Sequence, residues 1–186
     1  MMIIDLGDIN KAVVYKENGV SNCLELCKMI LRKYGITEYG LSSHVIKLMH
    51  EVNGKLVHYG NNIMDNYRNA IKCIDRHLEK GRPIIVGVNY KIGKGINEGS
   101  TDHFVVVYGK GYDDNIKCYY YTYYEVGKGN ITDVYNNDKN RFIYNIDKYP
   151  YLYDNESNLG GGSRFDITQV RPNDGILDGT VSQYLK

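Results

Sequence analysis

The sequence has no tryptophan and only three phenylalanines and three prolines among its 186 residues. No apolar run approaches the length that a membrane-spanning helix needs, so we expect no membrane partner. Neither sign of charge is in excess, because the chain has 23 basic and 22 acidic residues and neither kind forms a block. This balance predicts that nucleic acid is not a partner either. The length is enough to bury a core and indicates one domain.

Paired cysteine motifs are also missing. The four cysteines are Cys23, Cys27, Cys73 and Cys118. None of them lies in a CxxC or CxxH pair, so we expect no metal site, and no cofactor is needed. The opening segment carries Asp5 and Asp8 where a secretory signal peptide needs basic residues. We therefore expect reduced thiols and synthesis in the cytoplasm, with export by a route without a cleaved signal left open.

The first chemically distinctive feature is a cysteine at the start of a predicted helix. Ser21 and Asn22 are typical N-cap residues, and Gly35 lies where a helix usually ends. Between them, side chains for one buried face recur at helical spacing: Cys23, Cys27, Ile30, Leu31 and Tyr34. At a helix N-terminus, unpaired N–H groups and the helix dipole favour a thiolate, which makes Cys23 a candidate nucleophile. A buried structural cysteine is the alternative for Cys23, and it is our interpretation of Cys27.

The predicted order of elements is helices first and strands second. After the Cys23 helix, helices are expected over Ser43–Asn53 and Met64–Leu78. Strands are expected over Ala12–Tyr15, Lys55–Tyr59, Ile84–Tyr90, Asp102–Gly109, Lys117–Val126, Ile131–Tyr135, Arg141–Ile146 and Arg164–Val170. This order predicts an α+β fold, in which N-terminal helices pack on an antiparallel sheet. We divide the single domain into a lead-in (1–20), a helical half (21–81), a sheet half (82–171) and a tail (172–186).

His103 is the histidine best suited to act as a base. It begins an apolar strand directly after a glycine-rich loop, so a rigid element holds it at a half-exposed position. The alternative is that an apolar strand simply begins with a polar residue. The other four are expected to be solvated or packing residues, on helix surfaces or at a strand end: His44, His50, His77 and His58.

Tyrosine is abundant, with 19 residues, and five of them fall within six consecutive positions of one predicted strand. These five are Tyr119, Tyr120, Tyr121, Tyr123 and Tyr124. We expect most of them to be half-buried, with their hydroxyls in water. The alternative makes one face of the strand a platform for a peptide or glycan. The loop 93–101 before His103 is expected to form a lid or a substrate rim.

Three motifs, in the same order along residues 18–127, resemble those of one family. The first motif, Asn22–Gly35, has the pattern Cys-x3-Cys, then Met-Ile-Leu, then Tyr-Gly. The second, Gly81–Val86, resembles the strand that precedes the family's catalytic histidine. The third, Asp102–Gly109, resembles the strand that carries this histidine. The chain is thereby similar to the bacteriocin-processing (double-glycine) peptidase domains and their free-standing relatives. The resemblance implies a papain-like fold and amide cleavage through a thioester, with Cys23 as nucleophile and His103 as base.

Two positions depart from that family's pattern. The family has a Gln before the Cys that donates to the oxyanion, and this chain has Glu17 or Asn18 there; of the two, Asn18 can donate. The family has an Asp, usually followed by Pro, after the histidine strand, and here Glu125 is the nearest carboxylate, with Thr122 as an alternative. An exposed charge at a strand end is the other interpretation of Glu125. The expected site consists of Cys23, His103, Glu125 and, for the oxyanion, Asn18.

The sequence therefore predicts a cysteine-nucleophile hydrolase that cleaves an amide bond in a peptide, a protein or the stem peptide of peptidoglycan. A secreted toxin effector and a phage lysis factor are two settings for such an enzyme, by analogy alone. An inactive papain-like binding module is the alternative function, and an acyl-transferring, transglutaminase-like enzyme is a third. An inhibitor or immunity protein is a further partner to consider.

Overall fold

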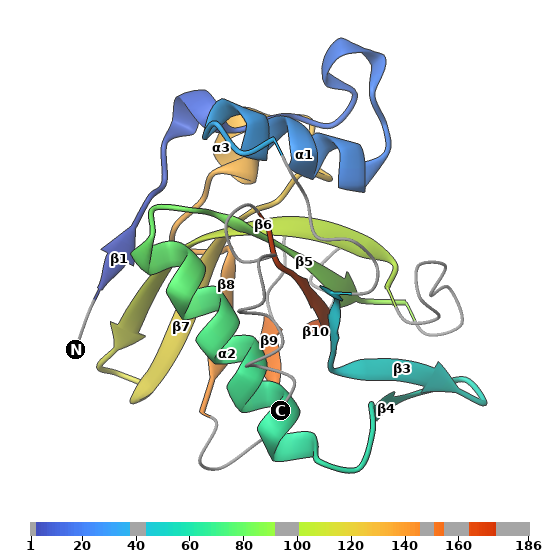
Figure 1. Ribbon diagram of the computed structural model, residues 1–186. Coiled ribbons are helices and arrows are strands. Elements are labelled where there is room, and N and C mark those ends of the chain that lie inside the picture. Colours follow the sequence, from blue (N-terminus) through green and yellow to red (C-terminus); the bar gives the residue numbers. More distant parts are fainter. Residues whose placement is uncertain (1–2, 38–43, 92–100, 146–150, 155–163, 174–186) are drawn as a thin grey trace.

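The computed structural model describes residues 3–37, 44–91, 101–145, 151–154 and 164–173. Its main feature is a closed barrel of antiparallel strands (Figure 1). The barrel strands are β5 (Ile84–Asn89), β6 (His103–Asp113), β7 (Cys118–Tyr124), β8 (Arg141–Tyr144), β9 (Leu152–Asp154) and β10 (Phe165–Arg171). Around the barrel the order is β6, β5, β10, β9, β8 and β7, and β7 pairs again with β6. Two short strands extend the sheet, β1 (Ile4–Asp5) beside β6 and β2 (Ile46–Lys47) beside β10.

This barrel corrects the predicted papain-like α+β fold. The described residues form only three α-helices, α1 (Cys23–Lys33), α2 (Ile63–Glu79) and the single turn α3 (Ile131–Val134), and the sheet closes on itself instead of forming one layer under a helical half. Closure depends on β9, which pairs with both β8 and β10. A strand of three residues has no periodicity that a sequence can display, so the bridging element was not predicted.

Two apolar clusters lie on opposite faces of the strands. The inner cluster takes side chains from all six barrel strands, and α2 packs against it. Its largest fully buried members are Tyr67, Tyr121, Tyr123, Phe142 and Phe165. The outer cluster joins α1 to the outside of β5 and β6, through Leu26, Cys27, Ile30 and Leu31 of the helix and Ile85, Phe104, Val106 and Tyr108 of the strands. Among the described helices, none combines the length and apolar character that crossing a membrane requires.

Asn22 fixes the start of α1. Its side-chain Oδ1 accepts hydrogen bonds from the backbone N–H groups of Leu24 and Glu25, at 3.0 and 3.2 Å. These are two of the N–H groups that a helix N-terminus leaves without an intrahelical partner. The helix predicted over this segment is confirmed, and Cys23 is its first residue.

Replacing Asn22 with alanine should lower the free energy of unfolding by about 1 kcal/mol, because two backbone N–H groups lose their acceptor. Urea denaturation at neutral pH, followed by circular dichroism, measures the change. Asn22→Asp is the matched control, since it keeps a side-chain acceptor, and it should stay near wild type. Equal stability of the alanine variant and the wild type would contradict the assigned cap.

The helix predicted over Ser43–Asn53 is wrong. That segment contains β2 and β3 (Met49–Val52), and β3 forms a hairpin with β4 (Lys55–His58). Asn53 and Gly54 connect the two strands with φ values of 50° and 72°, the left-handed conformations that a two-residue hairpin turn requires. The Asn-Gly pair was the sequence signal for this hairpin. It also places His50 on a strand and not on a helix surface.

Two predicted strands are also absent from the described structure. Residues 131–135 contain α3, because the side chain of Asn130 accepts from the N–H groups of Thr132 and Asp133 and so caps a helical turn. Residues 12–15 adopt no strand conformation. The strands predicted near 55–59, 84–90, 102–109, 117–126, 141–146 and 164–170 are confirmed as β4, β5, β6, β7, β8 and β10, with ends that differ by a few residues.

The tyrosines of β7 are more buried than expected. Tyr121, Tyr123 and Tyr124 are all 0% exposed, and their hydroxyls donate to protein acceptors instead of water. The acceptors are the carboxylates of Asp75 and Asp154 and the carbonyl of Asp8, at 2.6, 2.7 and 3.0 Å. Most of the tyrosine run is therefore part of the core, because buried hydroxyls need protein partners.

Candidate active site

Three of the predicted site residues meet where the start of α1 lies against the start of β6. Cys23 is the first residue of α1 and is half-buried. His103 is the first residue of β6 and is 5% exposed, and Glu125 follows the last residue of β7 and is 0% exposed. The three residues come from a helix and two neighbouring strands, so the outer cluster and the barrel pairing hold them in place.

The strand register explains why Glu125 reaches His103. Val106 pairs with Tyr124, which places Glu125 one step further on, opposite Val105. Side chains alternate between faces, so Val105 and His103 point to the same side of β6. One carboxylate oxygen, Oε1, lies 2.6 Å from His103 Nε2 and also accepts the backbone N–H of Gly127 at 2.8 Å. Glu125 is thus a buried hydrogen-bond partner of the imidazole and not an exposed strand-end charge.

The imidazole of His103 has two differently engaged nitrogens. Nε2 is held by Glu125, so Nδ1 is the nitrogen that can exchange a proton with the Cys23 thiol. The rings of Tyr90 and Phe165 pack around the imidazole, with centroids 6.4 and 5.9 Å away. The orientation of the base is therefore fixed by one hydrogen bond and two aromatic neighbours.

The electrostatics of the pair favour charge separation. Burial raises the pKa of the Cys23 thiol, but its hydrogen bond to His103 and the nearby imidazolium charge outweigh that effect, so its pKa lies below the ordinary value. Burial works to lower the pKa of His103, yet the Glu125 carboxylate and the hydrogen bonds to Cys23 and Glu125 raise it to about 10. The lowered thiol pKa and the raised imidazole pKa together favour a thiolate–imidazolium pair.

Two backbone N–H groups add to this effect. The backbone N–H groups of Phe104 and Leu24 help to lower the pKa of the Cys23 thiol, and the N–H of Leu24 also donates to Asn22 Oδ1. Sequence reasoning missed the contribution of Phe104, since a backbone group carries no residue-type signal. It becomes available only because α1 packs on the outside of β6.

The remaining cysteine of α1 differs from Cys23. Cys27 is 0% exposed, and burial, followed by the charges of Cys23 and Glu125, raises its pKa well above the ordinary value. A thiol in that environment stays protonated and packs as a small apolar group. The prediction that Cys27 is structural agrees with this environment.

His77 does not lie on a helix surface as predicted. It is 0% exposed, its Nδ1 donates to the carbonyl of Cys73 at 2.7 Å and its Nε2 accepts the N–H of Asn173 at 3.1 Å. Burial lowers the pKa of His77 to about 4, so the ring is neutral at pH 7. Its role in the fold is to tie the segment after β10 to α2.

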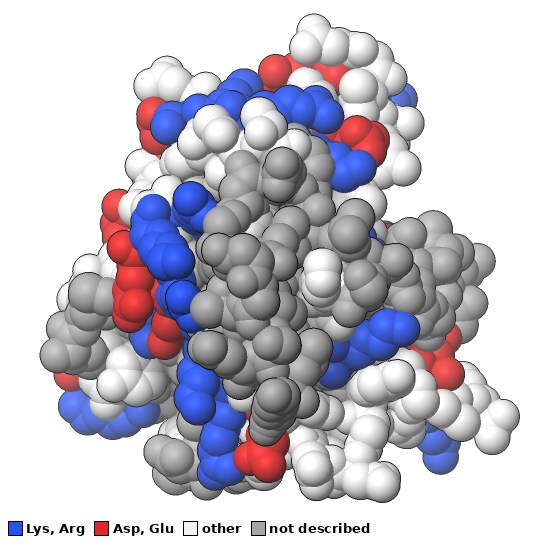
Figure 2. All heavy atoms as spheres, in the orientation of Figure 1, with Lys and Arg blue, Asp and Glu red and all other residues white. Residues whose placement is uncertain are grey.

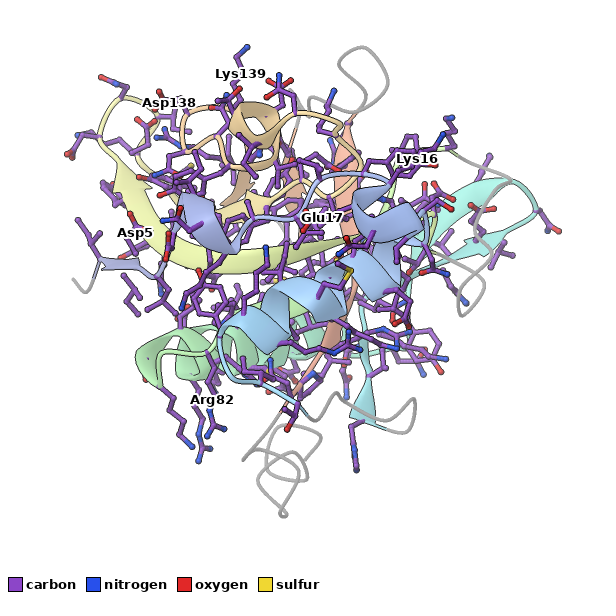
Figure 3. All side chains as sticks on the ribbon, turned by 90° about the horizontal axis from the view of Figure 1, so that it is seen from above. Asp5, Lys16, Glu17, Arg82, Asp138 and Lys139 are labelled. Atoms are coloured by element: carbon purple, nitrogen blue, oxygen red, sulfur yellow. The ribbon has the colours of Figure 1, made fainter. Side chains whose placement is uncertain are left out.

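Asn18 is not brought into the described cluster. It lies in the 3-10 turn Glu17–Gly19 with φ 52°, and its side chain is exposed. Figure 3 shows Glu17 of this turn, and Lys16 just before it, beside α1. No described contact joins Asn18 to Cys23 or His103. Thr122, the alternative partner for His103, lies opposite Gly109 and far along β6 from the imidazole.

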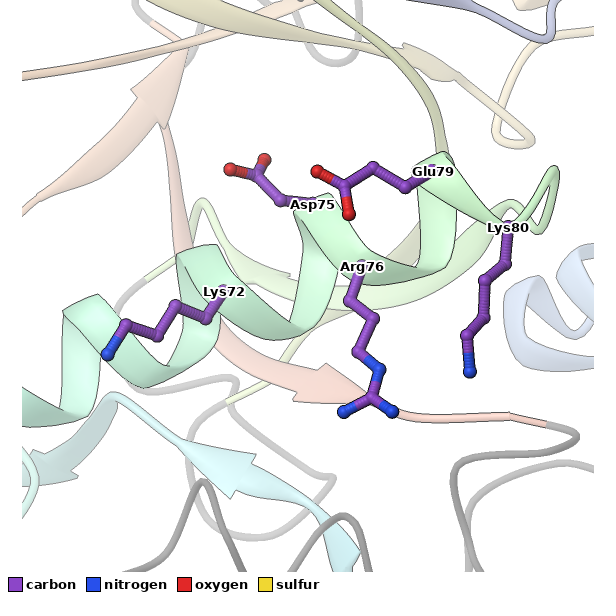
Figure 4. Close-up of a pocket in the computed structure, with 5 residues that line it drawn as sticks. All are labelled: Lys72, Asp75, Arg76, Glu79 and Lys80. Carbon is purple, nitrogen blue, oxygen red and sulfur yellow. The ribbon is translucent and has the colours of Figure 1, made fainter.

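A hollow elsewhere on the surface is lined by charged residues of α2 and of its C-cap: Lys72, Asp75, Arg76, Glu79 and Lys80. Figure 4 shows the three basic side chains on one side of the helix and the two acidic ones on the other. Figure 2 shows basic and acidic groups next to one another over this region. Such a mixed charged surface is typical of a solvated helix face. Within the described ranges, no group of three or more His, Cys, Asp or Glu side chains is placed to hold a metal ion.

Two other predicted features, the loop 93–101 and the tail 172–186, lie almost wholly outside the described residues. Comparison with known proteins adds no family assignment: no family model, no curated protein and no solved structure matches the chain. The geometry of Cys23, His103 and Glu125 is therefore the basis on which a function can be inferred.

Proposed function

We propose that this chain is a cysteine-nucleophile hydrolase that cleaves an amide bond in a peptide, a protein or a peptidoglycan stem peptide. One observation carries the proposal: a cysteine at a helix N-terminus has its pKa lowered by a neighbouring buried histidine, and Nε2 of that histidine lies 2.6 Å from a buried carboxylate. A nucleophile beside a base, with the base in turn held by an orienting group, is the general arrangement for attack on an acyl carbon.

In the first half of the reaction, the Cys23 thiolate attacks the carbonyl carbon of the substrate and a C–S bond forms. The His103 imidazolium gives the proton on Nδ1 to the leaving nitrogen as the C–N bond breaks. A thioester to Cys23 and a free amine result, and His103 is left neutral. Glu125 touches no reacting atom; it keeps Nε2 protonated and stabilises the imidazolium, which makes it a positioning residue.

In the second half, neutral His103 takes a proton from water, and the hydroxide attacks the thioester. The C–S bond breaks, the carboxylic acid product leaves and the thiolate–imidazolium pair is restored. The backbone N–H of Cys23, at the unpaired end of α1, is the oxyanion donor that we propose. Asn18 would have to turn toward the thiol to add a second donor.

The exposed position of Asn18 favours one second candidate, an inactive module that binds a peptide or a partner protein through the same site. Loss of an oxyanion donor costs about two to three orders of magnitude in rate, so a chain that lacks one can retain binding alone. The reactivity of the thiol separates the two candidates.

Iodoacetamide should label Cys23 selectively below neutral pH. The thiolate is the reacting form, and the lowered pKa of Cys23 keeps it populated where an ordinary thiol is protonated. The alkylation rate should therefore rise with pH through that lowered pKa and level off before ordinary thiols react. The measurement is the rate of carbamidomethylation at each pH, mapped to individual cysteines by mass spectrometry.

Cys118 is the internal control, because it is also half-buried but lies at the start of β7, away from the described histidines. Below neutral pH it should be alkylated more slowly than Cys23. If Cys23 reacts only at high pH, and no faster than Cys118, the hydrolase proposal is wrong and the binding module is favoured.

A further inference from the structure

A fourth charged group, Arg171, approaches the site from β10. Val170 belongs to the inner cluster, so its neighbours Gln169 and Arg171 point to the outer face, on which α1 packs. Arg171 pairs across the sheet with Ile85, a member of the outer cluster. The guanidinium carbon lies 4.9 Å from the centroid of the Phe104 ring, and the backbone N–H of Phe104 is the group that hydrogen-bonds to Cys23.

A chain of buried hydrogen bonds holds the guanidinium in this place. Arg171 Nε donates to Gln169 Oε1 at 3.0 Å, and Gln169 Nε2 donates to Thr101 Oγ1. The Thr101 and Thr168 hydroxyls are 2.8 Å apart, and Thr168 donates to the carbonyl of Gly87 at 3.2 Å. Gln169, Thr101 and Thr168 are all 0% exposed, and polar groups that are this deeply buried occur only where their partners are fixed.

Gly87 is part of the same arrangement. A Cβ at this position would lie 2.6 Å from Gln169 Cγ and 2.7 Å from Thr101 Cγ2. The glycine thus leaves the space in which Gln169 crosses β5 to reach Thr101. Any larger residue would displace the side chain that anchors Arg171.

The charges of the proposed site do not balance without Arg171. The Cys23 thiolate and the Glu125 carboxylate are negative, and the His103 imidazolium is the one positive group among the three. The cluster therefore carries one net negative charge at a mostly buried position, which is unfavourable in a medium of low dielectric constant. A guanidinium held over the ring of Phe104 lowers the cost of that negative charge.

We infer that Arg171 is a positioning residue that stabilises the anionic form of Cys23 through its fixed positive charge. The inference rests on the proposed function, since it concerns the same thiolate. During attack the negative charge moves from sulfur to the carbonyl oxygen, a shift of a few ångströms, so the guanidinium attracts it before and after the step. Cys27, one turn along α1, also experiences the positive charge of Arg171.

Two other acidic groups near the start of α1 each form an ion pair with a lysine of the same helix. Glu25 Oε1 lies 2.6 Å from Lys28 Nζ on the same helix. Glu17 Oε1 lies 3.8 Å from Lys33 Nζ, from the turn that precedes α1. The charged group that acts directly on Cys23 from another packed element is His103 on β6. Glu125, after β7, is in contact with His103, and Arg171 on β10 lies over the ring of Phe104.

The test is the pH midpoint of Cys23 alkylation by iodoacetamide in Arg171→Gln, compared with wild type. Loss of the positive charge should raise the midpoint by roughly 0.5 to 1 pH unit. Arg171→Lys keeps the charge and should restore at least half of the shift. If far-UV circular dichroism shows that Arg171→Gln folds poorly, the same measurement is made on Arg171→Met, which retains an apolar stem.

Arg164→Gln is the matched control. Like Arg171, Arg164 lies over an aromatic ring, with its guanidinium carbon 4.3 Å from the ring centroid of Tyr153, and its Nη2 lies 2.6 Å from Asp166 Oδ1. Its removal should leave the midpoint unchanged. An unshifted midpoint in folded Arg171→Gln or Arg171→Met overturns the inference alone. A wild type in which Cys23 reacts like Cys118 overturns both the inference and the proposed function.

Discussion

Cys23→Ala should have no measurable hydrolase activity, a loss of about 10^6-fold, because the covalent intermediate has no atom on which to form. Purified peptidoglycan and a denatured protein are the two substrates to test, and the release of new primary amines is the measurement. The fold should be kept, since Cys23 is half-buried and its side chain is not in the fully buried part of the outer cluster. The thermal unfolding midpoint should therefore stay close to that of the wild type.

Cys118→Ala is the control variant, and it should release amines at the wild-type rate. Cys118 lies in β7 on the opposite end of the strand from Glu125. Amine release by the Cys23→Ala protein at the wild-type rate would show that another group performs the reaction. Failure of the wild type on both substrates would remove the two leading targets, and the alkylation experiment would then decide between an enzyme of different specificity and a binding module.

Glu125→Gln should lower kcat by about 10^2- to 10^4-fold while KM changes little. The amide is the same size as the carboxylate and can still accept the hydrogen bond from His103 Nε2, but it carries no charge. The pKa of His103, which Glu125 helps to raise to about 10, should fall. The thiolate–imidazolium pair then becomes a neutral thiol–imidazole pair, and Cys23 alkylation should shift to higher pH.

The same variant should also change how stability depends on pH. A histidine whose pKa rises from about 6.5 in the unfolded chain to about 10 in the folded protein stabilises the fold fully below the unfolded value. That stabilisation is lost as the pH rises toward 10. The lowered pKa of Cys23 acts on stability in the opposite direction, so the comparison is made in the Cys23→Ala protein. That protein should lose stability over this range in urea denaturation, and Cys23→Ala combined with Glu125→Gln should lose less. Glu51→Gln in the same Cys23→Ala background changes an intermediate-exposure carboxylate on β3 and is the control, which should follow the Cys23→Ala curve.

The long elements of this fold could be predicted from the sequence, and its closure could not. The Cys23 helix and α2 have clear helical spacing, and β5 and β6 are continuous apolar runs. The hairpin after β2 was missed because an apolar pattern of short range fits both a helix and a strand, although the Asn-Gly turn pointed to a hairpin. Barrel closure depends on pairing between distant strands, which no local pattern encodes.

The residues of the candidate site could be predicted from the sequence, but the groups that surround them could not. Cys23 and His103 were identifiable because each has a chemical type and a place at the start of an element. Glu125 was found only as the carboxylate nearest to an expected position, and its hydrogen bond to His103 follows from the register of β6 and β7. Arg171 gave no signal in the sequence, because only β10 pairing with β5 brings it to the outer face near Phe104.

Attachment of α1 to the outside of the barrel has a consequence for the order of events in folding. His103 and Glu125 belong to the hairpin of β6 and β7, whereas Cys23 is far from both in the chain, so its contact with His103 requires the docking of a distant segment. Until α1 docks on β6, Cys23 has neither the imidazole nor the N–H of Phe104 beside it, and its thiol has ordinary reactivity. In a nascent or unfolded chain the Cys23 thiol is therefore no more reactive than an ordinary thiol, and it becomes a strong nucleophile only once the chain has folded.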